Sequence, residues 1–252
     1  MNIALILSGG TGTRAGGNIP KQYIAVCGRP VIGYCLDVFW NHPKINAVQI
    51  VADCGWREVI TAYMEEMRQR RNGWQENKAA AQKYCDKWRG FSEPGKNRQL
   101  SILNGLQDIL CYADRADTVI IHDAARPLVS EKQITACIEA VRAGHDGALP
   151  VLPMKDTVYF SEGGGRVTSL LERDKLFAGQ APEGFVLGKY YEANKALMPD
   201  RILGINGSTE PAVLAGMDVI MIEGDERNFK ITTQEDLQKF QENMMMGITT
   251  TV

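Results

Sequence analysis

Short apolar runs alternate along the chain with longer amphipathic segments. The runs predict buried strands, because each is of strand length, rich in β-branched residues and followed by turn-forming or charged residues. The longer segments predict helices. The predicted strands cover residues 3–7, 47–52, 118–122, 147–151 and 219–222. The predicted helices cover residues 31–40, 56–70, 101–112, 131–143 and 233–243, the last with a capping signal from Thr233 and Asp236.

This alternation of strands and helices predicts an α/β fold with a doubly wound, mostly parallel sheet. In such sheets, ligands bind beyond the carboxyl ends of the strands. The chain has 252 residues. Because single hydrophobic cores stop growing at about 250–300 residues, we expect one domain over residues 1–252.

Two segments interrupt the alternation. Residues 64–95 are polar and mix acids with bases, which favours a surface helix plus loop over a nucleic-acid patch. Residues 156–172 place two strand-like runs around the turn SEGGGR, which predicts a β-hairpin. A hairpin that projects from the domain would expose its apolar residues unless a partner covered them. We therefore expect a homodimer, with residues 153–177 as the dimerisation arm.

Composition excludes several classes of protein. Hydrophobic residues make up 44% and charged residues 23%, as in an ordinary globular protein. The net charge of -2 provides no basic field for nucleic acid or for an anionic membrane, so local basic groups must bind any anionic substrate. The six cysteines form no CxxC pair, and no apolar run approaches the roughly 20 residues of a membrane span. We expect a cytoplasmic protein with reduced thiols.

The strongest candidate for chemistry is the glycine-rich segment LSGGTGTR, residues 7–14, directly after the first predicted strand. Glycines let a backbone approach a ligand closely and turn its N–H groups toward phosphate oxygens. Arg14 and Lys21 add positive charge to the same region. The segment therefore predicts a phosphate-binding loop.

Other interpretations of this loop fit less well. No Walker motif G-x-x-x-x-G-K-[ST] is present. Residues 10–15 match the dinucleotide pattern G-x-G-x-x-A, but that motif must open a helix. Gly16, Gly17 and Pro20 would lie inside this helix, where glycine costs about 1 kcal/mol and proline about 3 kcal/mol. A purely structural loop leaves the cluster of glycines and basic residues unexplained.

A second group of candidates lies at the end of a predicted strand, in HDAARP, residues 122–127. Asp123 there is placed either to hold Mg²⁺ against phosphates or to cap the following turn. His122 fits a packed or hydrogen-bonding residue better than a general base. Taken alone, Ser101 is a helix N-cap, and Arg173 and Lys230 are solvated charges.

Taken in order, these segments resemble the cytidylyltransferases that make CDP-methylerythritol or CDP-ribitol. The resemblance runs from about residue 3 to residue 237. Its markers are LSGGTGTR, PKQY, R-x-x-S-x-x-x-G-L (from Arg98), HDAARP, PMKDT, ERDKLFAGQAP and NFKITTQEDL. HDAARP together with KDT is more similar to the methylerythritol phosphate enzymes than to the ribitol phosphate enzymes.

The resemblance implies a Rossmann-like nucleotidyltransferase fold, Mg²⁺ as cofactor, and transfer of CMP from CTP to a polyol phosphate with release of pyrophosphate. It places Asp123 on the ribose or on the metal. The implied catalytic residues are Arg14, Lys21 and Lys230. The implied nucleotide-binding residues are Ser8, Gly9, Gly10, Thr11, Gly12, Thr13, Gly95, Lys96, Ser101, Asp123 and Ala124. The implied acceptor-binding residues are Arg126, Thr157 and Arg173, the last two reaching a neighbouring subunit on the hairpin.

The chain departs from the family pattern at a few positions. Ser208-Thr209 replaces the usual Thr-Asp, Arg227 stands where many methylerythritol phosphate enzymes have an acid, and Pro94-Gly95 replaces a pair of glycines. With these changes, the acceptor can be methylerythritol phosphate, ribitol 5-phosphate or another polyol phosphate. The presence of a second metal ligand is also undecided. The alternative function without catalysis is that of a nucleotide-binding regulator. A dinucleotide-dependent oxidoreductase comes last because of Pro20.

Overall fold

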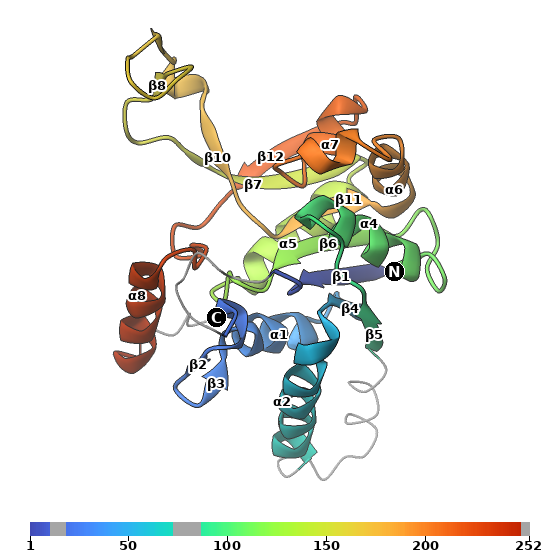
Figure 1. Ribbon diagram of the computed structural model, residues 1–252. Coiled ribbons are helices and arrows are strands. Elements are labelled where there is room, and N and C mark those ends of the chain that lie inside the picture. The colour runs from blue at the N-terminus through green and yellow to red at the C-terminus, as the bar shows by residue number, and fades with distance from the viewer. Residues whose placement is uncertain (11–18, 73–86, 248–252) are drawn as a thin grey trace.

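A mixed β-sheet forms the centre of the fold. The computed structural model describes residues 1–10, 19–72 and 87–247. Within them, eight strands form one sheet in the order β10-β7-β11-β6-β1-β4-β5, and β12 pairs with β7 (Figure 1). The strands are β1 (Asn2–Leu7), β4 (Ala47–Val51), β5 (Trp88–Ser92), β6 (Thr118–Asp123), β7 (Gly147–Pro153), β10 (Phe177–Gly179), β11 (Glu183–Val186) and β12 (Val219–Glu223).

The strand directions confirm the predicted doubly wound, mostly parallel sheet. β1 runs parallel to β4 and to β6, β4 runs parallel to β5, and β7 runs parallel to β12. β11 is antiparallel to both β6 and β7, and β10 is antiparallel to β7. The parallel strands therefore end at a common edge, which is where a ligand is expected.

Helices cover both faces of the sheet because both faces of its central strands are apolar. Ala4 and Ile6 belong to one core, and Ile3 and Leu5 to the other. Helices packed on the first core are α1 (Val31–Asn41), α2 (Cys54–Asn72) and α5 (Glu131–Arg142). Helices packed on the second are α4 (Arg98–Ile109), α6 (Leu187–Lys195) and α7 (Glu210–Leu214). Among the described residues, no helix is both long and apolar enough to cross a membrane.

The C-terminal helix α8 (Gln234–Met245) belongs to a third, smaller core. Leu237 and Phe240 of this helix pack with Val26 and Val31. Val26 lies in a short hairpin of β2 (Ala25–Val26) and β3 (Arg29–Pro30). The packing fixes the segment just before α8, which carries Lys230.

The predicted elements agree with the observed ones except for the helix predicted over residues 101–112, which is shifted and ends at Ile109. The five predicted strands are all present, with ends that differ by one or two residues. The capping box of Thr233 and Asp236 at the start of α8 is confirmed. The helix predicted from residue 101 begins at Arg98 instead, because the side chain of Asn97 accepts the hydrogen bond from the Leu100 N–H at 2.9 Å. The interpretation of Ser101 as an N-cap is therefore wrong.

The two unusual segments had different outcomes. In residues 64–95, α2 forms the predicted helix, but residues 88–92 form strand β5 rather than loop. Residues 73–86 lie outside the described residues. The predicted hairpin is confirmed, since β8 (Tyr159–Phe160) pairs antiparallel with β9 (Ser169–Leu170). Figure 1 shows it projecting beyond β7 and β10, away from the body of the fold. Its role as a dimerisation arm stays a prediction.

Candidate active site

Four loops meet at the carboxyl ends of β1, β4, β5 and β6, and backbone hydrogen bonds join them. The Ala124 N–H donates to the Leu7 carbonyl at 3.0 Å. The Ser8 N–H donates to the Val51 carbonyl at 2.8 Å, and the Ala52 N–H donates to the Ser92 carbonyl at 3.2 Å. Residues far apart in the sequence are thus tied into one edge of the sheet, as expected for a ligand site in this fold.

Asp123, the last residue of β6, lies at the centre of a cluster of cations. Arg98 donates to its Oδ1 atom from Nε at 3.0 Å and from Nη2 at 2.8 Å. The Lys230 Nζ atom lies 2.8 Å from Oδ2 of the same carboxylate, and the Arg126 Nε atom lies 4.0 Å from it. Asp123 is only 8% exposed. The structure therefore brings three of the predicted site residues together and adds Arg98 to them.

The cations keep the Asp123 carboxylate ionised. Burial alone would raise the pKa of Asp123, but Arg98 and Lys230 outweigh burial and hold this pKa well below its usual range. Burial lowers the pKa of His122 to about 4. His122 is therefore neutral near pH 7, and its Nε2 atom lies 2.9 Å from the Arg126 carbonyl, which accepts its hydrogen. This contact fits the predicted hydrogen-bonding role of His122.

The glycine-rich loop begins beside this cluster. The Ser8 hydroxyl donates to the Tyr23 hydroxyl at 2.7 Å, so Ser8 braces the loop from inside. Gly9 packs on Pro94, and an added Cβ atom at Gly9 would lie 2.5 Å from the Pro94 Cβ atom. Lys21 opens the 3-10 helix η2 (Lys21–Tyr23). Thr11, Gly12, Thr13 and Arg14 lie outside the described residues, and their roles stay predictions.

The loop predicted to face the base is folded tightly against the start of α4. The Gly95 N–H donates to the Ser101 hydroxyl at 2.9 Å, and that hydroxyl donates to the Asn97 carbonyl at 2.9 Å. An added Cβ atom at Gly95 would lie 2.3 Å from the Leu100 Cβ atom, so only glycine fits there. Lys96 is exposed beside it. The contact of Gly9 with Pro94 sets this loop against the glycine-rich loop.

The predicted acceptor residues divide into two groups. The Arg126 Nη1 atom donates to the Asn228 carbonyl at 2.7 Å, which ties the Asp123 cluster to the segment that carries Lys230. Thr157 and Arg173 are exposed and belong to the projecting arm. Arg173 donates to the Lys155 carbonyl at 3.3 Å, within the same arm. The structure of one chain therefore does not bring these two residues to Arg126.

The sequence model of the family described as IspD, 2-C-methyl-D-erythritol 4-phosphate cytidylyltransferase, matches residues 2–245. The chain belongs to this family. The match spans the glycine-rich loop, the Asp123 cluster and the arm, so it covers every segment of the candidate site. It confirms the resemblance predicted from the motifs.

Individual members of the cytidylyltransferase family agree with this assignment. The chain is 34% identical to the 2-C-methyl-D-erythritol 4-phosphate cytidylyltransferase of Rubrobacter xylanophilus over 238 residues, 93% of this chain and 91% of that protein. It is 34% identical to that of Geobacter metallireducens over 237 residues, 93% of each. The 4-diphosphocytidyl-2C-methyl-D-erythritol synthase structure from Anaerococcus prevotii matches with a TM-score of 0.75 and 23% identity over 97% of this chain and 96% of that one. This last likeness confirms the fold.

At Ser208-Thr209, where the chain departs from the family pattern, both hydroxyls contact a buried acid. Glu183, at the start of β11, accepts hydrogen bonds from the Ser208 hydroxyl at 2.5 Å and from the Thr209 hydroxyl at 2.8 Å. The Arg98 Nη1 atom donates to the same Ser208 hydroxyl at 2.7 Å. A carboxylate thus stands beside the two hydroxyls, although the residue at position 209 is not an acid. Burial raises the pKa of Glu183.

Replacement of Ser208 by alanine is expected to lower the free energy of unfolding by about 1.5–3 kcal/mol, since it removes hydrogen bonds to the buried Glu183 carboxyl group and to the half-buried Arg98 guanidinium. Ser208 is 2% exposed and bridges Arg98 and Glu183. Urea unfolding followed by circular dichroism measures the change. Ser161→Ala is the control, because the Ser161 hydroxyl donates to the Arg166 carbonyl on the exposed arm. A loss no larger for Ser208→Ala than for this control would contradict the bridging role.

The second departure, Arg227, pairs with an acid two positions away in the sequence. Its Nη2 atom lies 2.8 Å from Asp225 Oδ2, and its Nε atom contacts both oxygens of that carboxylate. Glu226 pairs instead with Lys155 at the base of the arm. Asn228 donates from Nδ2 to the Ala181 carbonyl at 2.7 Å. The Arg227 charge is therefore paired locally, and the backbone carrying Lys230 is held by Asn228.

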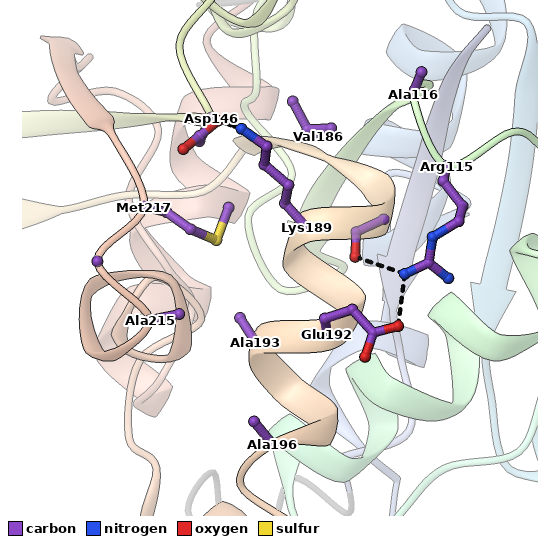
Figure 2. A pocket seen from close by; sticks show the side chains of 12 residues that line it. Arg115, Ala116, Asp146, Val186, Lys189, Glu192, Ala193, Ala196, Ala215 and Met217 are labelled. Carbon is purple, nitrogen blue, oxygen red and sulfur yellow. Dashed lines mark hydrogen bonds and ion pairs between the residues drawn. The ribbon is translucent and has the colours of Figure 1, made fainter.

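A separate hollow of about 750 Å³ lies beside α6 (Figure 2). Its two pairs of opposite charges are satisfied within the wall, because Arg115 lies 2.6 Å from Glu192 and Lys189 lies 2.5 Å from Asp146. Within the described residues, its lining includes none of the predicted site residues. The hollow is therefore distinct from the Asp123 cluster.

Sequence reasoning missed three residues that shape the site: Arg98, Glu183 and Gln22. Arg98 belongs to one of the quoted motifs, but the sequence assigned it no role. Its contact with Asp123 depends on the strand order, which the sequence does not give. Glu183 gave no local signal, since its partners lie 25 and 26 positions away. Gln22 stands next to Lys21 in PKQY, and that adjacency was the available signal.

Proposed function

We propose that this chain transfers CMP from CTP to 2-C-methyl-D-erythritol 4-phosphate and releases pyrophosphate. Membership of the cytidylyltransferase family supports the substrates and the reaction. The observation that carries the proposal within the structure is the Asp123 carboxylate, held between Arg98 and Lys230 next to the glycine-rich loop. This arrangement offers an ionised oxygen ligand and positive charge at one edge of the sheet.

The reaction itself requires little covalent work from the protein. A phosphate oxygen of the acceptor attacks the α-phosphorus of CTP, the bond to the β-phosphate oxygen breaks, and pyrophosphate leaves with that electron pair. Positioning and neutralisation of charge supply the catalysis. We assign Arg14 and Lys21 to the triphosphate, and Lys230 to the attacking phosphate near the α-phosphorus. Arg126 is assigned to the acceptor.

We further propose Mg²⁺ as the cofactor, held by Asp123 together with phosphate oxygens. Magnesium in such sites is typically bound by one or two carboxylates plus substrate phosphates. Within residues 1–10, 19–72 and 87–247, no group of three or more His, Cys, Asp or Glu side chains forms a metal site. One ionised carboxylate beside a phosphate-binding loop fits this mode of binding. The ion would neutralise charge on the triphosphate.

We infer that two copies of the chain associate through the arm. Tyr159 is 60% exposed, Phe160 47%, Val167 66% and Leu170 64%, and a second copy would remove these apolar side chains from water. The family resemblance implies that Thr157 and Arg173 reach into the neighbouring subunit. In the dimer, the arm of one copy would therefore bring Thr157 and Arg173 to Arg126 of the other.

Replacement of Leu170 by aspartate is expected to convert the dimer to monomers and to raise KM for the acceptor, because a charge would be buried in the interface. Sedimentation velocity and steady-state kinetics measure the two effects. Val213→Asp on α7 is the matched control, because Val213 is also 64% exposed but lies outside the arm. A wild-type chain that sediments as a monomer at all concentrations would contradict the proposed dimer.

We place the chain in the cytoplasm. The cysteines within the described residues are free thiols, which suits a reducing compartment.

Pyrophosphate release tests the proposed function directly. Purified protein with Mg²⁺ is assayed with CTP, UTP, ATP or GTP, each against methylerythritol phosphate and ribitol 5-phosphate. The expected result is release with CTP and methylerythritol phosphate only. Release with ribitol 5-phosphate alone would correct the acceptor. Binding of CTP without release for either acceptor would favour a regulator, and absence of CTP binding would overturn the proposal.

A further inference from the structure

Gln22 is a buried side chain that contacts the glycine-rich loop from behind. It is 4% exposed and follows Lys21 in η2. Its Nε2 atom donates to the Ser8 carbonyl at 2.8 Å and to the Gly10 carbonyl at 2.6 Å. One amide nitrogen, which carries two hydrogens, therefore satisfies two carbonyls of the loop. The Tyr23 hydroxyl also donates to the Ser8 carbonyl, at 2.9 Å.

These contacts decide which way the loop's peptide groups face. In a trans peptide, the C=O and the following N–H point in opposite directions. Because the Ser8 carbonyl points toward Gln22, the Gly9 N–H points to the other side of the loop. Gly10 is exposed, and an added Cβ atom there would meet nothing within 4 Å. Among the described residues there is space beside Gly10, and backbone N–H groups that face such a space bind anions.

We propose that Gln22 is a positioning residue for the triphosphate of CTP. By holding two carbonyls inward, it turns the N–H side of the loop toward the nucleotide phosphates. It also fixes Lys21, its neighbour in η2, relative to the same loop. This inference rests on the proposed function, because it assumes that the bound nucleotide is CTP. Gln22 touches no reacting atom and acts through the backbone of Ser8 and Gly10.

The test is Gln22→Met, which keeps the length of the side chain and removes both donors. Isothermal titration with CTP and with CMP, in the presence of Mg²⁺, measures two dissociation constants for each protein. We expect affinity for CTP to fall about 10- to 100-fold, the range expected when the two hydrogen bonds that hold the loop are lost. Affinity for CMP falls less, because CMP lacks the β- and γ-phosphates. KM for the acceptor is expected to stay unchanged.

Gln133→Met is the matched control for the substitution. Gln133 is also 4% exposed, and its side chain closes the capping box at the start of α5. This variant is expected to lose thermal stability and to keep the wild-type ratio of CTP to CMP affinity. Tyr23→Phe provides a second route if Gln22→Met does not fold. It removes one donor to the Ser8 carbonyl, and we expect a smaller, equally triphosphate-selective loss.

The outcomes separate the inference from the function on which it rests. A selective loss for CTP in Gln22→Met or Tyr23→Phe, with Gln133→Met unchanged, supports the positioning role. If the wild-type chain binds CTP but the variants keep its ratio of CTP to CMP affinity, the inference alone is overturned. This holds whether both affinities fall equally or neither falls. A wild-type chain that does not bind CTP overturns the proposed function and this inference with it.

Discussion

Exchange of Asp123 for asparagine is expected to lower turnover by about 10³-fold and the free energy of unfolding by about 1.5–3 kcal/mol. Asparagine has the same shape but no charge, so the proposed metal ligand is lost. Arg98 and Lys230 would then face a neutral amide at the atoms they now contact at 2.8 Å. Pyrophosphate release and urea unfolding measure the two effects.

Asp37→Asn is the control for this exchange. Asp37 pairs with Arg29 at 2.6 Å and accepts a hydrogen bond from Tyr63 at 2.7 Å, but it has no proposed role in the reaction. It is expected to lose some stability and to keep wild-type turnover. Wild-type turnover in Asp123→Asn would contradict the assigned site.

The Asp123 charge also predicts how stability depends on pH. Arg98 and Lys230 outweigh the effect of burial and hold the pKa of Asp123 below its unfolded value of about 3.9. The stabilisation from this carboxylate is therefore present above about pH 4 and is lost as the pH falls toward the folded-state pKa. Between pH 5 and pH 3, Asp123→Asn is expected to lose less stability than the wild type. Urea unfolding across this range checks the difference.

Replacement of Lys230 by methionine is expected to lower kcat about 10²- to 10³-fold at saturating substrates, as for the loss of one donor that stabilises developing charge. Lys230 Nζ lies 2.8 Å from Asp123 Oδ2, at the centre of the candidate site. Lys21→Met, in η2 beside the glycine-rich loop, is expected to have an effect of the same order. Single-turnover pyrophosphate release separates loss of chemistry from weaker binding.

Lys132→Met is the matched control for the two lysine variants. Lys132 also pairs with an acid, Glu223, at 3.4 Å, but both side chains are more than 80% exposed. Its loss is expected to leave kcat and stability unchanged. Full turnover in both Lys21→Met and Lys230→Met would show that these lysines are not the catalytic cations.

Local patterns were enough to predict most of the parallel strands, but not β5 (Trp88–Ser92), which lay in a segment predicted to be helix and loop. β1, β4 and β6 are continuous apolar runs, because both of their faces are covered, and this pattern distinguishes a buried parallel strand. The hairpin of the arm was predicted from its glycine-rich turn. Asp123 was predicted because the last residue of a parallel strand lies at the ligand edge.

The antiparallel part of the sheet was not predictable in the same way. β10 has three residues and β11 has four, which is too short for a periodic pattern. β11 lies between β6 and β7, and β10 pairs with β7, so the place of each strand depends on partners distant in sequence. Glu183 lies on β11. Because this strand was not predicted, the contact of Glu183 with Ser208 was not predicted either. Arg98 was quoted in a motif, but the charge balance around Asp123 requires the fold.

The projecting arm has a genetic consequence. In the proposed dimer, each active site combines the Asp123 cluster of one chain with Thr157 and Arg173 from the arm of the other. A chain inactivated at Lys230 still carries an intact arm, and a chain inactivated at Arg173 still carries an intact cluster. A mixed dimer of these two chains would contain one site built entirely from undamaged parts. Two alleles that each fail alone would therefore complement each other when expressed together.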